Sequence, residues 1–153
     1  MVYTITVPEG YGYVVLIALG LTPILSFAQG ILVSTFRKPA GVAYPNAYAT
    51  PQQMKALPVA YRFNCAQRAH ANLLENMPQS MLCMLFCGLF HPRATLWLGG
   101  IWLLGRILYA YGYVYGSGQD EQGKGKGRTI GGAFWIGQFA LIGLSIYVAM
   151  GLL

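Results

Sequence analysis

Two long stretches of this sequence contain no charged residue, and they constrain the fold more strongly than any other feature. Residues 11–36 and 129–153 are each longer than the ~20 residues with which a helix crosses the hydrocarbon core of a bilayer. Only 9% of all residues are charged, whereas soluble domains average about 25%. Because helices satisfy their own backbone hydrogen bonds in lipid, the sequence predicts an all-α integral membrane protein.

Two further apolar segments bring the predicted membrane spans to four, within a single domain of residues 1–153. Residues 94–116 are apolar apart from Arg106. Residues 77–90 are too few to cross a core of ~30 Å at ~1.5 Å per residue, so this span is expected to include the polar segment before it. Pro23 lies inside the first span, where we expect a kink. The predicted spans are approximately residues 11–36, 66–90, 94–116 and 129–153.

The basic residues of the connections gather on one side of the predicted four-helix bundle, and the other side carries only Arg93. The positive-inside rule therefore places the connections after the first and third spans in the cytosol. The net charge of +6 is attributed to topology and site chemistry rather than to nucleic-acid binding, because no recognition motif accompanies it. The basic residues on the predicted cytosolic side are Arg37, Lys38, Lys55, Arg62, Lys124, Lys126 and Arg128.

The second span begins with polar side chains that share one face of the helix. At about 100° per residue, Asn64, Asn72, Glu75 and Gln79 all lie within about 40° of Arg68. Ionisable groups inside a membrane are costly and normally face protein or a water-filled site, which favours a functional role for this stripe. The alternative is a polar stripe that only joins helices.

His70 lies on the opposite side of the same helix, about 160° from Arg68. A single bundle can bury one of the two polar faces, and the other would then meet lipid. We therefore expect an oligomer in which a neighbouring subunit covers the His70 side. Whether His70 contacts a ligand or only completes a structural contact stays open at this point.

The third span repeats the pattern, since Arg106, Tyr109 and Tyr113 fall within about 60° of one another. Glu75 is the only acidic residue in any predicted span, so Glu75 and Arg106 are expected to share a site, directly or through a ligand. Arginines bind carboxylates and a carboxylate binds a cation, so a small zwitterionic peptide suits this cluster. No metal-ligand cluster is evident, and no metal is expected. The predicted cluster comprises Arg68, Asn72, Glu75, Arg106, Tyr109 and Tyr113, with Arg37, Lys38 and Arg128 at its rim.

Two segments resemble those of a known family. "FNCAQRAHANLLENMP", residues 63–78, is similar to the signature of the membrane-associated proteins in eicosanoid and glutathione metabolism, the MAPEG family. "GRILYAYGYVYG", residues 105–116, resembles the matching segment of the third span. The resemblance implies a homotrimer of four-helix subunits that binds glutathione between subunits on the cytosolic side. It also implies the activity of a membrane glutathione S-transferase that can reduce lipid hydroperoxides as well. Glutathione would be the cosubstrate, and a lipophilic electrophile or a lipid hydroperoxide the second substrate.

The resemblance also implies roles for individual residues. Arg68, Asn72 and Glu75 would bind the glutathione peptide, and Tyr109 and Tyr113 would contribute from the third span. His70 and Arg37 align with positions that reach glutathione from the adjacent subunit. Arg106 aligns with an arginine that supports the site. Arg128 would stabilise the glutathione thiolate, and Lys126 is a rival because the connection before the last span is unusually rich in Gly and Lys.

Several alternatives stay open on the sequence. Some leukotriene-forming members of the family have Tyr directly after the site Glu, where this chain has Asn76, which argues against leukotriene synthesis. Two other functions are a non-catalytic lipid-binding regulator of the same family and a small transporter that uses Glu75. The expected location is the endoplasmic reticulum membrane, with the outer mitochondrial and nuclear membranes as alternatives.

Overall fold

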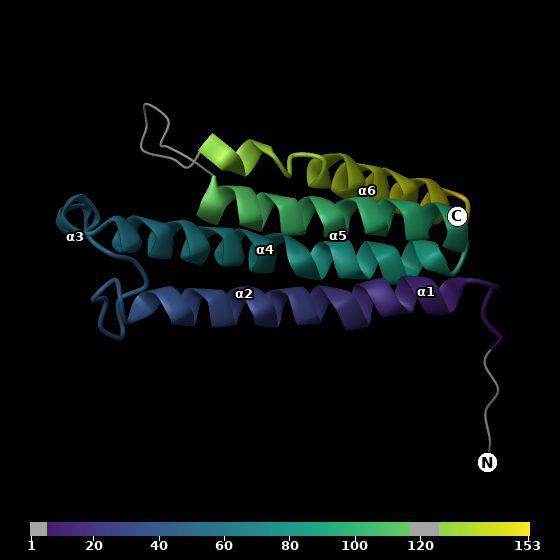
Figure 1. Cartoon of the computed structure of the whole chain (residues 1–153). Coiled ribbons are helices and arrows are strands. Elements are labelled where there is room, and N and C mark those ends of the chain that lie inside the picture. Colours follow the sequence, from purple (N-terminus) through teal and green to yellow (C-terminus); the bar gives the residue numbers. More distant parts are fainter. Residues whose placement is uncertain (1–5, 117–125) are drawn as a thin grey trace, which may run out of the picture.

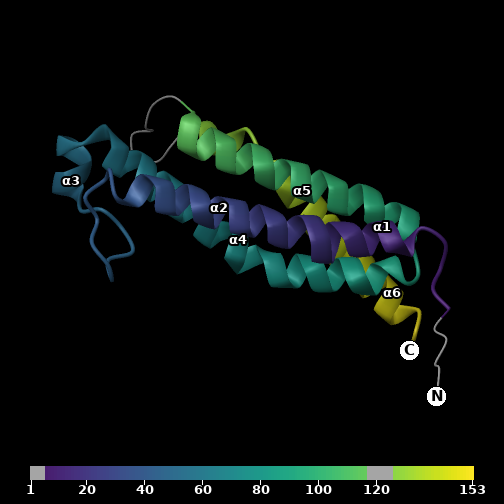
Figure 2. The same cartoon turned by 60° about the horizontal axis from the view of Figure 1, so that its bottom comes forward.

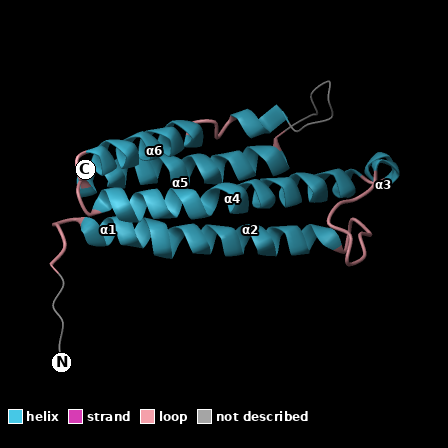
Figure 3. Ribbon diagram, turned by 180° about the vertical axis from the view of Figure 1, so that it is seen from behind, coloured by secondary structure: helices cyan, strands magenta, loops and turns pink. Residues whose placement is uncertain are grey.

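The computed structural model describes residues 6–116 and 126–153, and the secondary structure in these residues is helical, with no strand (Figure 1). The prediction of an all-α chain is therefore confirmed for the part of the sequence that the structure describes. The long helices lie side by side, and Figures 2 and 3 show the same arrangement from two other directions.

The first rod is one continuous helical segment with a π-helical stretch in its first half. The π-helix ends immediately before Thr22 and Pro23. Proline lacks a backbone N–H and its ring collides with the carbonyl four residues earlier, and a π-helical turn is a common way to accommodate such a disturbance. The kink expected at Pro23 thus takes the form of a local widening through which the helix continues. The rod consists of α1 (Tyr11–Val15), η1 (Leu16–Leu21) and α2 (Thr22–Arg37).

The remaining helices follow after a loop. The short helix α3 is capped by Thr50 and Gln53, whose side chains each bond to the other's backbone N–H. The helix α4 is 31 residues long, or roughly 46 Å at 1.5 Å per residue, so it is longer than the ~30 Å core of a bilayer. The elements in order are α3 (Pro51–Ala56), α4 (Pro58–Gly88), α5 (Pro92–Tyr115), η2 (Lys126–Thr129) and α6 (Phe134–Met150).

The last helix begins later than the predicted span at residues 129–153. A 3₁₀ turn, η2, and a further turn precede α6, which starts at Phe134. Gly131 lies in that turn, where a Cβ atom would collide with backbone atoms of Gly105 and Tyr109 on α5. At this close contact with α5, the chain forms turns, and the regular helix begins only at Phe134.

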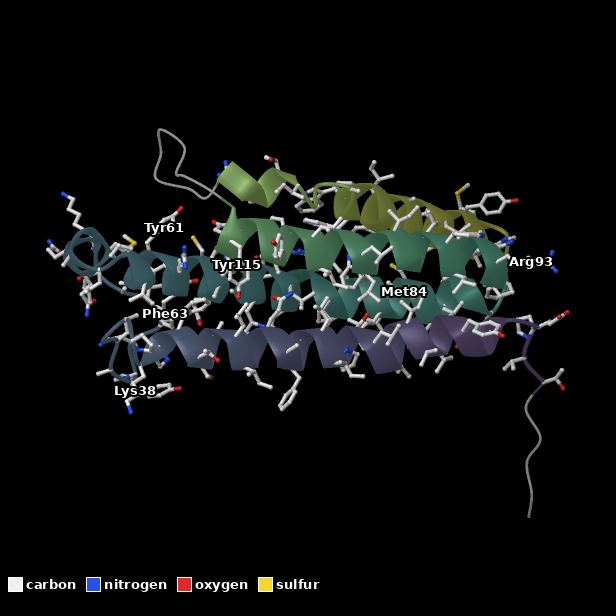
Figure 4. The ribbon with its side chains drawn as sticks, viewed as in Figure 1. Lys38, Tyr61, Phe63, Met84, Arg93 and Tyr115 are labelled. Carbon is white, nitrogen blue, oxygen red and sulfur yellow. The ribbon has the colours of Figure 1, made fainter. Side chains whose placement is uncertain are left out.

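The helices α4 and α5 are the central elements, because they contact each other and each of them also contacts the first rod and α6. Large apolar side chains from each rod fill the space between them, and Figure 4 shows Met84 of α4 among them. A second, smaller core lies beneath the loop that joins α2 to α3, around Phe63. The buried residues of the main core are Val14, Ala18, Leu73, Met84, Trp102, Leu103, Phe134 and Leu141.

Two helical segments in the described part of the chain are long and apolar enough to cross a membrane, namely Tyr11–Arg37 and Gly127–Met150. Large apolar side chains cover their outer surfaces, such as Phe27, which is 73% exposed, and Ile136, which is 67% exposed. The helices α4 and α5 carry the polar groups of the predicted site, and that they also cross the membrane stays a prediction.

The two ends of the bundle differ in charge. Figure 1 shows α1 and the C-terminus at one end and α3 at the other. Figure 4 shows Lys38 at the α3 end and Arg93 at the end that holds α1. The connection that contains Lys124 lies outside the described residues, as does the side chain of Lys126.

Candidate functional site

The polar stripe on α4 forms a hydrogen-bonded group. Nη1 of Arg68 lies 2.8 Å from Oε1 of Glu75, two helical turns later, and Nδ2 of Asn72 lies 3.4 Å from Oε2 of Glu75. The side chains of Arg68 and Glu75 are 46% and 51% exposed. An ion pair on the outer face of an apolar bundle is accessible to a ligand or to a second chain.

The guanidinium of Arg106 lies inside the bundle, where its residue is 1% exposed. Nη1 of Arg106 donates a hydrogen bond of 2.7 Å to Oδ1 of Asn72. The guanidinium carbon also lies 3.7 Å from the ring centroid of Phe134 and 5.4 Å from that of Trp102, which are cation–π distances. Asn72 therefore joins Arg106 to Glu75, so the two predicted partners are connected through an amide.

Two phenol groups extend this cluster along α5. The ring centroids of Tyr109 and Tyr113 are 5.5 Å apart, and Tyr109 also packs edge-on against Phe134. Both phenols lie close enough to Arg68 and Arg128 for electrostatic interaction. The structure thus brings residues of α4, α5 and η2 together at one end of the bundle.

Two glycines place Arg128 beside α5. A Cβ atom on Gly112 of α5 would collide with the carbonyl of Gly127 in η2, and a Cβ atom on Gly127 would collide with the carbonyl of Gly112. Only residues without a Cβ allow two backbones to approach this closely. The position of Arg128 in η2 therefore depends on the contact between these two glycines.

Arg37 is directed toward its own loop and away from the cluster. Nη1 of Arg37 donates a hydrogen bond of 2.7 Å to the carbonyl of Asn46. Its guanidinium carbon lies 4.2 Å from the ring centroid of Tyr44 and 4.9 Å from that of Phe63. Among the described residues, Arg37 thus bonds to its own loop and packs against Phe63 of α4, and its contact with glutathione in a neighbouring subunit stays a prediction.

His70 faces α2 on the other side of α4. It lies beside Gly30, where a Cβ atom would be 3.8 Å from Nε2 of His70. The Nδ1 atom of His70 is buried and has no hydrogen-bond partner among the described residues. The residues around an open cavity of about 570 Å³ on this face are Ser26, Phe27, Gly30, Ile31, Ser34, Thr35 and His70.

Comparison with known protein families matches residues 15–150 to the MAPEG family, which is most of the chain. The chain belongs to the MAPEG family. MAPEG proteins are membrane-associated, bind glutathione and act on hydrophobic substrates, and the family includes glutathione transferases, peroxidases and eicosanoid-synthesis enzymes. The matched region contains every residue of the cluster described above.

One residue of the predicted stripe has a structural role in this MAPEG chain. Asn64 binds the loop before α3, because its Oδ1 accepts from the N–H of Ala49 at 2.7 Å and its Nδ2 donates to the carbonyl of Ala49 at 2.9 Å. Helical periodicity places Asn64 on the same face as Arg68, but the loop packed above that face occupies its side chain. Asn64 is therefore expected to hold the loop.

Replacing Asn64 with Ala is expected to lower the free energy of unfolding by about 1–3 kcal/mol, because both polar groups of Ala49 lose their partner. Glutathione affinity should change little. Thermal unfolding and the rate of tryptic cleavage after Lys38 measure the first effect, with Gln52→Ala on the exposed side of α3 as the control. Loss of glutathione binding with an intact loop would show that Asn64 belongs to the site.

The sequence interpretation did not identify a set of buried amide and indole groups that adjoins the cluster. Asn76 and Gln138 are 8% and 3% exposed, and Trp102 is fully buried. Gln138 is the only residue with an amide side chain in residues 129–153. Its isolation in an apolar segment is the sequence signal that could have revealed this set of buried polar groups.

No group of three or more His, Cys, Asp and Glu side chains in the described residues could hold a metal ion. That the protein needs no metal stays a prediction.

Proposed function

We propose that this MAPEG protein is an integral membrane glutathione S-transferase that also reduces lipid hydroperoxides with glutathione. Its motifs most resemble those of microsomal glutathione S-transferase 3. The observation that carries the proposal is the hydrogen-bonded series Arg68–Glu75–Asn72–Arg106, with two phenols and Arg128 beside it. This arrangement combines a carboxylate with several guanidinium groups at one place.

Glutathione carries two carboxylates and one ammonium, which suit these groups. Arginine binds a carboxylate through two parallel hydrogen bonds, and Glu75 can bind the ammonium. The ion pair between Arg68 and Glu75 is half exposed, so a peptide can exchange its own charges for those of the pair. Asn72 is held by Arg106 and completes the peptide-binding surface.

The proposed chemistry uses the thiol of glutathione. A free thiol has a pKa of about 8.5, and the thiolate is the nucleophile, so a nearby cation such as Arg128 favours the reactive form. The thiolate attacks the carbon of a lipophilic electrophile, and the C–S bond forms as the leaving group departs. With a lipid hydroperoxide, the thiolate attacks the terminal oxygen, so that an S–O bond forms as the O–O bond breaks and the lipid alkoxide leaves. The alkoxide takes a proton, which yields a lipid alcohol and glutathione sulfenic acid.

We further propose that four transmembrane helices per subunit assemble as a homotrimer in which Arg37 and His70 complete the glutathione site of a neighbour. Support comes from the direction of these two side chains, which lie away from the cluster of their own chain. The positive-inside rule orients the α3 end toward the cytosol. The proposed location is the endoplasmic reticulum membrane, with lipid surrounding the outer faces of the trimer.

The decisive experiment is difference absorbance of glutathione near the thiolate band, on the purified protein and on the variants Arg128→Ala and Lys126→Ala. We expect a thiolate band in the wild type and in Lys126→Ala, and loss of that band in Arg128→Ala. Loss of the thiolate band only in Lys126→Ala would show that Lys126, and not Arg128, stabilises the thiolate.

The absence of a thiolate band from a correctly assembled wild-type protein would contradict the transferase. It would favour the lipid-binding regulator, which requires no thiolate.

A further inference from the structure

A buried amide network joins three helices next to the cluster. Nε1 of Trp102 on α5 donates to Oε1 of Gln138 on α6 at 3.1 Å, and Nε2 of Gln138 donates to Oδ1 of Asn76 on α4 at 3.0 Å. Nδ2 of Asn76 then donates to the carbonyl of Asn72 at 2.8 Å. We call Trp102, Gln138 and Asn76 the amide network.

The direction of every hydrogen bond in the amide network follows from its first member. An indole N–H can only donate, so Gln138 must present its carbonyl oxygen to Trp102 and its NH₂ group to Asn76. Asn76 must therefore accept with Oδ1, which leaves its NH₂ group to donate to the carbonyl of Asn72. Gln79 also donates to Oδ1 of Asn76 at 3.1 Å, in agreement with this assignment.

The amide network lies directly beside the residues of the proposed glutathione site. Asn76 follows Glu75 in sequence and lies one helical turn after Asn72, and Trp102 lies one turn before Arg106. Pro78 interrupts the backbone hydrogen bonding of α4 at this level, because it has no N–H to donate. Side-chain bonds to the backbone, including that of Ser80 to the carbonyl of Asn76, reinforce the same turn.

The position of α4 relative to α5 and α6 depends on these bonds. A shift of α4 along its axis would leave the buried amides of Asn76 and Gln138 without partners, which is costly in an apolar interior. The same shift would move Asn72 away from Arg106. The amide network therefore selects the one arrangement of the three helices in which Asn72 and Glu75 meet the groups of α5.

We propose that Gln138 and Asn76 are positioning residues for the glutathione site, which they align from the side of the bundle interior without contacting the peptide. This inference rests on the proposed function of that site. According to this inference, α6 contributes to glutathione binding through Gln138. This contribution differs from the stabilisation of the thiolate by Arg128.

The test compares two buried positions one helical turn apart on α6. In Gln138→Leu, we expect the dissociation constant for glutathione to rise by about tenfold, because small misplacements of binding groups are costly. In Leu141→Ala, which removes core packing but no member of the amide network, we expect a lower Tm and an unchanged dissociation constant. Isothermal titration calorimetry well below the Tm of each variant provides the measurement.

A second variant, Trp102→Phe, removes the first donor and keeps an aromatic ring beneath Arg106, so it should weaken glutathione binding in the same direction. Thr95→Val is the control on α5, because the Thr95 hydroxyl is buried and has no partner among the described residues. Affinities that simply follow Tm across all four variants would overturn the inference and leave the proposed function intact. No glutathione binding by the wild type would overturn both.

Discussion

Replacing Arg106 with Met is expected to reduce glutathione-dependent activity on the order of 10²-fold while the protein stays as stable as the wild type or becomes more stable. The activity falls because Oδ1 of Asn72 loses the donor that holds it 2.7 Å away, and Asn72 then no longer presents its NH₂ group to Glu75. The stability is retained because a buried guanidinium is costly. Two of its nitrogens, Nε and Nη2, have no hydrogen-bond partner among the described residues.

Methionine is the suitable replacement for Arg106, because it is unbranched, apolar and of similar volume. Its sulfur makes favourable contacts with aromatic rings, and the rings of Phe134 and Trp102 surround this position. The measurements are the free energy of unfolding and kcat/KM for glutathione conjugation.

Arg106→Lys is the matched control, and we expect it to retain part of the activity but to lower the stability. An ammonium can still donate to Asn72, so part of the activity should remain. It is more strongly hydrated than a guanidinium, so the stability should fall. Full activity in Arg106→Met would show that Asn72 needs no support from α5, and the described connection between Arg106 and Glu75 would have no role in binding.

The second large effect is expected from Gly112→Ala, which should lower kcat on the order of 10²-fold with little change in glutathione affinity. The added Cβ atom collides with the carbonyl of Gly127, and backbone cannot yield as a flexible side chain can. The turn η2 must then move away from α5 and take Arg128 with it. Arg68 and Glu75 on α4 are unaffected, so the peptide still binds while the thiolate loses its cation.

Gly100→Ala is the control for this prediction, since Gly100 lies on the same helix and a Cβ atom there would meet nothing within 4 Å. Steady-state kinetics separate kcat from KM, and the thiolate absorbance band reports on Arg128 directly. A loss of affinity equal to the loss of kcat would mean that Gly112 supports the whole site and not Arg128 in particular. An unchanged thiolate band would show that η2 does not position the catalytic cation.

The sequence by itself determined the features that arise within one helix. The residues Arg68, Asn72 and Glu75 were predicted to share a face from the 100° turn per residue, and the structure shows them hydrogen-bonded to one another. The opposite direction of His70 follows from the same rule, and His70 indeed faces α2. Such relations are local, because the helical backbone alone sets the angle between two of its side chains.

Only the tertiary structure decided which groups meet across helices. Asn64 and Arg68 share a face, yet one binds the loop at Ala49 and the other binds Glu75. Arg106 reaches Glu75 through Asn72, and Gln138 meets Asn76 from a helix more than sixty residues away. The delayed start of α6 at Phe134 likewise depends on backbone contacts between Gly131 and α5. These outcomes depend on how far apart the packed helices lie and on their relative positions along the bundle axis. Close contacts between glycines and hydrogen bonds between buried amides set both quantities. The periodicity of a single segment carries no information about either of them.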